Sequence, residues 1–242
     1  MDESEVIKER FKSAVSSAAR AISENFNLDV KFGKDKSSTK NTLNLPEIES
    51  IKNYKDFTNL RAFADSEALK IKYTDKKIYS DNEPKGINAK TLYAVAEQIR
   101  CEKIGSENLI GVKNNLIQSY QNKFEKKEID DLTDDSEIPL TEAFEMYLRN
   151  YFFEIKQNET AKKVLNYSKN LFDKELKLKL NELDSCLKNQ TQFNQLVSKI
   201  INNLKFDDSD QTENEQKDTE AQDSSSSESN ENNDDSKEQK KE

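Results

Sequence analysis

Three charged residues interrupt an apolar helical pattern in the stretch LYAVAEQIRCEKIGSENLIGVKNNL, residues 92–116. Glu97 and Arg100 are three positions apart, so an ion pair within one helical turn is possible beside the apolar stripe. Glu102 projects in another direction, and the three charges therefore do not converge on one metal ion from this helix. Paired-carboxylate chemistry would need partners from a second element. The pattern favours a structural or interfacial role for these residues over a chemical one.

Two roles stay open for Arg100. Tyr93 and Ile104 lie on the same side of the helix and favour a buried side chain, with Glu97 or Asp65 as its ionic partner. In that case Arg100→Ala leaves a buried charge unpaired and costs on the order of 3 kcal/mol, against less than about 1 kcal/mol for an exposed pair. The alternative is a docking face, and the variant would then fold normally but lose a binding partner.

Other groups that commonly carry catalysis are missing, because the sequence contains no histidine. Ser-His-Asp and Cys-His catalysis are excluded, as are the usual zinc sites that contain histidine. Neither G-x-G-x-x-G nor a Walker phosphate loop occurs. Cys101 and Cys186 show no metal-ligand spacing, and the acidic stretch 128–137 lacks the glycine and final glutamate spacing of an EF-hand. We expect no catalytic residue, metal ligand or cofactor in this chain.

Charge is distributed unevenly along the 242 residues. Residues 207–242 contain fourteen acidic and four basic residues, with Ala221 as their only aliphatic residue, which predicts a disordered acidic tail. The nearly neutral remainder, residues 1–206, has 33 acidic and 34 basic residues and gives no electrostatic reason to bind nucleic acid. No apolar run reaches the roughly 20 residues of a membrane span. The acidic N-terminus is unlike a signal peptide, and we expect a cytoplasmic protein.

Hydrophobic periodicity predicts one mainly α-helical, multi-helix domain over residues 1–206. Two short β-type runs flank a turn-rich segment at about 28–46, and they predict a single small β-hairpin that lies on a helix. The tail, residues 207–242, is expected to lie outside the domain. The expected helices cover residues 5–25, 54–73, 89–104, 106–124, 140–152, 159–189 and 192–206.

Local signals predict how the helices in the middle of the chain begin and end. Residues 79–88 are rich in turn formers and predict a loop whose last residue, Asn88, caps the next helix. Gly105 is placed to cap the end of that helix, and Ser106 to start the following one. Two helices joined so tightly must turn sharply, which predicts a helical corner.

Several short motifs follow one another in a particular order. They are R-x3-D-x2-A-L at residues 61–69, Pro84, LYAVAEQIRCEKIG at 92–105, and GVKNNL at 111–116. This order resembles the N-terminal region of the T subunit of aerobic cobaltochelatase, the CobT family, and the resemblance extends over residues 8–206. The resemblance marks nine positions as structural or interfacial: Arg61, Asp65, Glu97, Gln98, Arg100, Glu102, Gly105, Gly111 and Asn115.

The sequence also departs from the family pattern. Ala94 stands where the family has aspartate, and Thr74 and Tyr79 stand where the family commonly has histidines flanking Asp75. A metal-handling role is therefore not carried over to those two positions. Family members continue after an acidic linker into a von Willebrand A-type domain with a metal-ion-dependent D-x-S-x-S motif, whereas this sequence ends within the linker.

The resemblance implies a subunit of an ATP-dependent cobaltochelatase, which inserts Co²⁺ into the corrin ring during cobalamin biosynthesis. An AAA+ ATPase subunit would bind ATP with Mg²⁺, and a large corrinoid-binding subunit would receive the Co²⁺. This chain would serve as a non-catalytic scaffold that couples the two in a hetero-oligomer. The alternative is a freestanding interaction module, or a truncated relic, that regulates a MoxR-type AAA+ ATPase outside cobalamin synthesis.

Overall fold

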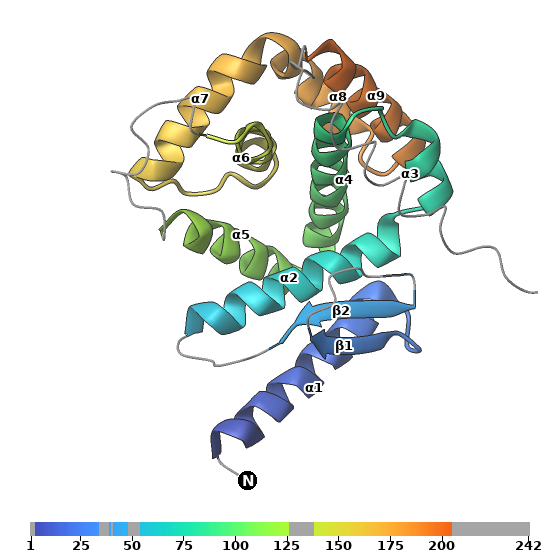
Figure 1. Ribbon diagram of the computed structural model, residues 1–242, viewed down its shortest axis with the longest axis vertical. Helices are drawn as coiled ribbons and strands as arrows, with labels where there is room; N and C mark the ends of the chain where they lie inside the picture. Colours follow the sequence, from blue (N-terminus) through green and yellow to red (C-terminus); the bar gives the residue numbers. More distant parts are fainter. Residues whose placement is uncertain (1–2, 34–38, 40, 48–53, 126–137, 205–242) are drawn as a thin grey trace, which may run out of the picture. The chain divides into compact units, whose positions relative to one another are not determined.

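A computed structural model describes residues 3–33, 39, 41–47, 54–125 and 138–204. All of them belong to the first of the two units into which the chain divides, Met1–Lys205. The unit is built mainly of α-helices, with one two-stranded sheet near the N-terminus, which confirms the expected fold class (Figure 1). The acidic stretch 128–137 and the expected tail at 207–242 lie outside the described residues.

The elements follow the chain in an order that the periodicity had largely predicted. Helix α2 spans the 20 residues that were expected, and the single helix expected over 159–189 is divided by a short 3₁₀ turn. The elements are α1 (Glu3–Ser23), β1 (Asp29–Gly33), β2 (Thr42–Pro46), α2 (Tyr54–Tyr73), α3 (Lys76–Asn82), α4 (Ile87–Asn108), α5 (Ile110–Glu125), α6 (Leu140–Phe153), α7 (Glu159–Leu176), η3 (Lys177–Lys179), α8 (Leu180–Ser185) and α9 (Gln190–Asn203).

Helix α4 is the central element of the unit. It contacts α2, α5, α6 and α9, and Figure 1 shows it running between these helices. Its apolar side chains Leu92, Ala96 and Ile99 are fully buried, as their helical spacing predicted. Because neighbours cover α4 on several sides, its charged residues Glu97, Arg100 and Glu102 are buried as well.

The N-terminal elements form a separate part of the core. One apolar cluster combines residues of α1, β2, α2 and α5 with Leu28 and with Cys101 of α4, and Leu43 and Leu45 of β2 are fully buried in it. Val30 and Phe32 of β1 pack against the same cluster. The sheet therefore lies on helices, as a two-stranded sheet must to be stable.

The predicted β-hairpin is wrong in strand direction. The two strands pair in parallel, with Asp29 opposite Thr42 and Gly33 opposite Pro46. Alternation of apolar residues fixes which face of a strand is buried, but it is the same for both directions of pairing. The connecting residues 34–41 are numerous enough to return the chain to the starting end of β1, although parallel connections are usually longer.

The loop predicted at 79–88 and the N-cap predicted for the helix after it are also wrong. Part of the expected loop at 79–88 is helical, because α3 continues to Asn82, with Asp75 as its N-cap. Helix α4 begins one residue before Asn88, and its N-cap position is Gly86, which has a positive φ of 93°. Glycine adopts this conformation without the steric cost that a side chain brings.

Gly105 does not end α4, which continues through Ser106 to Asn108. Its role is close packing: a Cβ atom at this position would overlap the Leu69 side chain and lie 2.6 Å from Leu69 Cδ1. The sharp corner between α4 and α5 is confirmed, but it lies at Leu109. The glycine is thus needed for the approach of α4 to α2 and not for the turn.

Candidate functional site

Glu97 and Arg100 form a buried ion pair on α4. Arg100 donates from Nε to Glu97 Oε2 and from Nη2 to Glu97 Oε1, both at 2.8 Å. Glu97 is 0% and Arg100 2% exposed. Two parallel N–H···O bonds of this kind are stronger and more specific in geometry than a single contact. Of the two roles left open for Arg100, the structure shows the buried one, with Glu97 as the partner and not Asp65.

Both members of the pair also bind other segments of the chain. Arg100 donates to the carbonyl oxygen of Tyr73 at 2.6 Å and to that of Leu187 at 3.1 Å. Glu97 accepts from Thr74 Oγ1 at 2.8 Å and from Asn194 Nδ2 at 3.1 Å. We call Glu97, Arg100, Thr74 and Asn194 the Glu97 network. It joins α4 to the end of α2, to the segment before α9, and to α9 itself.

Glu102 forms a second buried ion pair, with a partner on another helix. The Arg149 guanidinium of α6 donates to Glu102 Oε2. Ser66 of α2 donates to Glu102 Oε1, and the Tyr120 hydroxyl of α5 lies 3.2 Å from the same oxygen. We call Glu102, Arg149, Ser66 and Tyr120 the Glu102 network. It joins four helices through side chains alone.

The Arg149 guanidinium is held on its face and at its edge. Its Cζ atom lies 3.4 Å from the centroid of the Tyr120 ring, so cation and ring are stacked. Its Nε donates to Glu145 Oε1 at 2.8 Å, and Lys123 Nζ lies 2.7 Å from Glu145 Oε2. Burial opposes ionisation of Glu145, but Arg149 and Lys123 outweigh it and lower the pKa of this carboxyl. Together with Glu145 and Lys123 at its edge, the Glu102 network therefore balances two carboxylates against two cations.

Asp65 belongs to a third, smaller arrangement on α2. Arg61 donates to Asp65 Oδ1 at 2.7 Å, and Asn115 of α5 donates to Asp65 Oδ2 at 3.0 Å. Burial raises the pKa of Asp65 more than these two donors lower it. The motif residues Arg61, Asp65 and Asn115, which are far apart in sequence, thus meet where α2 packs on α5.

The remaining motif positions divide into two kinds. Gln98 is half-buried and donates to Ser66 Oγ at 2.6 Å, so it supports the Glu102 network. Gly105 permits the contact of α4 with α2. Gly111 is exposed in the first turn of α5, where an added Cβ would meet no atom within 4 Å. Nothing within the described chain explains a glycine at that position.

Of the three positions that depart from the family pattern, Thr74 belongs to the Glu97 network. Besides its bond to Glu97, the Thr74 hydroxyl lies 3.3 Å from Cys101 Sγ. The carbonyl oxygen of Tyr79 accepts from the Tyr93 hydroxyl at 2.9 Å.

Burial, with a further contribution from Glu97, raises the pKa of the Cys101 thiol to about 12. Cys101 and Cys186 are buried free thiols, and a protonated, desolvated thiol of this kind is a poor nucleophile.

Sequence reasoning did not find several residues of these networks. Arg149 lies in the helix expected over 140–152, where periodicity alone does not single it out, although it is buried and lies four residues after Glu145. That spacing was the available signal, because a charge inside an apolar face requires a partner. Asn194 and Ser66 gave no comparable signal, since small polar residues are common on helix surfaces.

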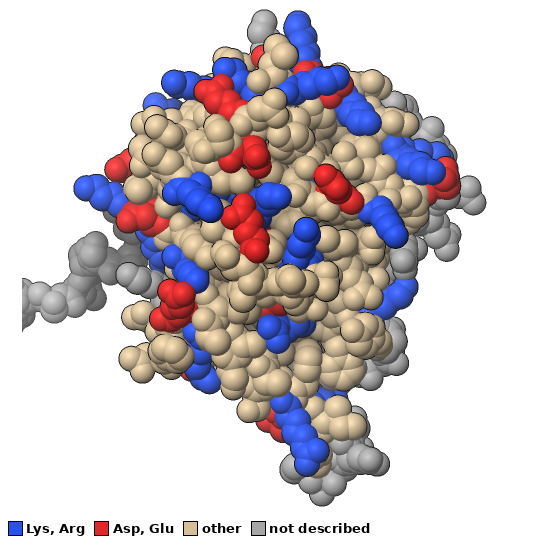
Figure 2. Space-filling view, turned by 180° about the vertical axis from the view of Figure 1, so that it is seen from behind, with Lys and Arg blue, Asp and Glu red and all other residues tan. Residues whose placement is uncertain are grey.

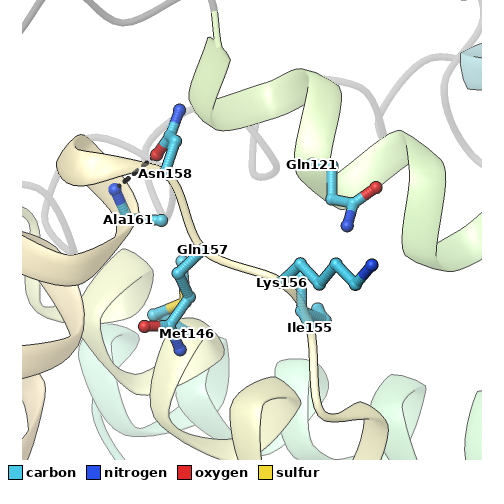
Figure 3. A pocket seen from close by; sticks show the side chains of 7 residues that line it. All are labelled: Gln121, Met146, Ile155, Lys156, Gln157, Asn158 and Ala161. Carbon is cyan, nitrogen blue, oxygen red and sulfur yellow. Dashed lines mark hydrogen bonds between the residues drawn. The ribbon is translucent and has the colours of Figure 1, made fainter.

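A surface cavity of about 270 Å³ lies apart from the networks, between α5, α6 and the start of α7 (Figure 3). Met146, Ile155 and Ala161 supply apolar lining. Polar lining comes from Gln121, Lys156, Gln157 and Asn158, of which Asn158 accepts from the Ala161 amide and caps α7. The residues singled out in the sequence do not line it.

Three further findings concern the surface and the described ranges as a whole. Basic and acidic side chains are interspersed over the face shown in Figure 2. Within the described residues, no three His, Cys, Asp or Glu side chains are grouped so that they could hold a metal ion. Each helix in these ranges is too short or too polar to cross a membrane.

Comparison with known proteins gives one family match. The model of the family described as cobalamin biosynthesis protein CobT matches residues 5–242. No solved structure matches the chain.

Proposed function

Since this match covers nearly all of its length, the chain belongs to the cobalamin biosynthesis protein CobT family, and we propose that it is a non-catalytic subunit of an ATP-dependent cobaltochelatase. Membership of the family places the chain in cobalamin biosynthesis. The proposal adds a specific role within that process: a scaffold that couples ATP hydrolysis on one partner to metal insertion on another.

The observation that carries the scaffold role is the internal use of the charged motif residues. Glu97, Arg100 and Glu102 are at most 2% exposed, and each bonds to side chains or carbonyl groups of other helices. Groups that are fully engaged in this way hold helices together, and they are not free to accept a proton from a substrate or to bind a metal ion. The central charged residues of the family motif thus contribute to a rigid helical body.

The partners follow from the proposed reaction. An AAA+ ATPase subunit would bind ATP with Mg²⁺, and a large subunit would bind the corrinoid. Co²⁺ would be the substrate of the complex and not a resident group of this chain. A helical body of this kind can present one surface to each partner, because the Glu102 network holds α2, α4, α5 and α6 in fixed relation.

Reconstitution tests the proposal directly. The chain is co-expressed with the AAA+ subunit and the large subunit encoded in the same genome, and complexes are isolated through a tag on the large subunit. Insertion of Co²⁺ is followed by the change in corrinoid absorbance in the presence of ATP and Mg²⁺. We expect insertion to require all three proteins, while this chain alone hydrolyses no ATP.

Two outcomes would reject the proposal. One is full cobalt insertion by the other two subunits when this chain is omitted. The other is failure of the chain to co-purify with either partner under conditions in which it is folded. An assay that contains the chain and large subunit but no AAA+ subunit is the matched control, and it should give no insertion.

A further inference from the structure

Helix α9, the last helix of the described residues, is held to its neighbours mainly by apolar side chains. Helix α9 packs on α3 and α4 through four apolar side chains that are at most 5% exposed, Phe193, Val197, Ile200 and Ile201. Its polar contacts with α4 are the Glu97 network and, just before the helix, an ion pair of the exposed Lys188 with Glu107 at 3.3 Å. Asn194 donates to Glu97, and the Leu187 carbonyl just before the helix accepts from Arg100.

The two charges of that network lie on the same helix. If α9 moves away, Glu97 and Arg100 still neutralise each other within α4, and Thr74 and the Tyr73 carbonyl remain as further partners. Departure of α9 therefore breaks hydrogen bonds but strands no charge in the core. Helix α6 is different, because its removal would separate Arg149 from Glu102.

One polar atom at the α9 interface has no hydrogen-bond partner among the described residues. Asn194 is 0% exposed, yet no donor in the described part of the chain reaches its Oδ1 atom. A buried acceptor without a donor is destabilising relative to the hydrated state. Opening of α9 would return this oxygen to water. The free energy that holds α9 against α4 is therefore smaller than the burial of its apolar side chains alone suggests.

Helix α3 is tied to α9 more than to the apolar core. Gln190 accepts from the Asp75 amide at 2.8 Å and donates to the Asp75 carbonyl at 3.1 Å. Ser198 donates to the carbonyl of Asn82 at the other end of α3. Helix α3 has no fully buried residue, so most of what holds it is α9 and the bond between Tyr93 and Tyr79.

We propose that α9, together with α3, opens from α4 as one cooperative unit while α2, α4, α5 and α6 remain folded. Regions with separable contacts commonly open at a lower free energy than the whole protein. The inference concerns the isolated chain and does not rest on the proposed chelatase role.

Hydrogen exchange of the full chain, followed by mass spectrometry under native conditions, tests the inference. Peptides from α9 and α3 should exchange at least about tenfold faster than peptides from α6. The amides of α6 exchange only when the whole protein unfolds, whereas those of α9 and α3 exchange on local opening. Gln190→Ala removes both bonds to Asp75 and should speed exchange in α9 and α3 by about fivefold or more, with α6 unchanged.

Gln192→Ala is the matched control, because it changes the same residue type at an exposed position in the first turn of α9. It should leave all rates unchanged. Ser198→Ala removes the contact at the other end of α3 and should repeat the effect of Gln190→Ala. The inference is wrong if α9 and α6 exchange at the same rate, or if Gln190→Ala speeds both equally.

Discussion

The Glu97 network and the Glu102 network are two solutions to the same problem, a carboxylate buried on α4. In the first, the cation lies on the same helix, and the outer contacts are two backbone carbonyls and two neutral side chains. In the second, the cation comes from α6, and the contacts with α2 and α5 are made by hydroxyl groups. Neither carboxylate is exposed to solvent.

The difference teaches which parts of the fold are interdependent. A charge pair within one helix remains neutral whatever the neighbouring helices do, so neighbours can bind to it and leave. A pair shared between helices fixes both of them, because separation leaves two uncompensated charges in the core. The comparison predicts that α4 and α6 form a permanent unit and that α9 is attached more loosely.

The largest effect is expected at the shared pair. Arg149→Ala leaves Glu102 buried without a cation and removes the stacking on Tyr120, which should lower the free energy of unfolding by about 4 kcal/mol. Urea unfolding measures this change. Lys123→Ala is the control at the edge of the same network, where its side chain is 41% exposed, and it should cost less than about 1 kcal/mol. A loss below that of the control would show that the pair is not the main link to α6.

A smaller loss, about 3 kcal/mol, is expected for Arg100→Ala. The carboxylate of Glu97 loses its cation but keeps Thr74 and Asn194 as hydrogen-bond donors, which softens the penalty. Urea unfolding again gives the value, and Arg10→Ala, at an exposed position of α1, is the control. If Arg100→Ala proved as stable as the unchanged protein, the account of the Glu97 network would be overturned.

The close approach of α4 to α2 is tested by two glycine substitutions. Gly105→Ala places a methyl group against Leu69 and should cost about 1–3 kcal/mol. Gly111→Ala, where the added group meets no atom, should leave stability unchanged or raise it by up to about 1 kcal/mol. In a double variant with Leu69→Ala, the combined loss should be smaller than the sum of the two separate losses, because the added methyl group no longer meets the Leu69 side chain. Equal effects at the two glycines would contradict the packing role assigned to Gly105.

The smallest expected effect is a pH dependence of stability that comes from Glu145, at the edge of the Glu102 network. The folded state lowers the pKa of Glu145 below its ordinary value of 4.5, so its ionisation stabilises the fold above that pH. This contribution is lost as the pH falls below 4.5. The difference in unfolding free energy between the unchanged protein and Glu145→Gln should therefore shrink on acidification. A difference that grows towards acid pH would contradict the prediction.

Helical periodicity was sufficient to predict much of the fold. The bounds of α2 were predicted to the residue, and α4, α5 and α6 to within a few residues, because their apolar faces are regular. Strand direction was not predictable, since alternation is symmetric. The end of α4 was misplaced because glycine near a helix end has two explanations, a turn or a close contact, and the sequence does not show which neighbour lies opposite.

The candidate site was predictable only within one helix. The pair of Glu97 with Arg100 follows from their spacing, which is a local property. The partner of Glu102 is 47 positions away, and the donors Ser66, Tyr120 and Asn194 come from three different helices. Such contacts depend on how helices pack, and a single sequence contains no direct record of that packing.

The most direct test of the central claim, that the buried charges are structural, is to remove both charges of the shared pair together. Glu102→Gln with Arg149→Met keeps an acceptor for Ser66 and Tyr120 and strands no charge. Its unfolding free energy should exceed that of Arg149→Met alone by about 2 kcal/mol. In the reconstituted complex the double variant should insert Co²⁺ at nearly the unchanged rate. A double variant that is stably folded and still inserts no Co²⁺ would contradict the claim.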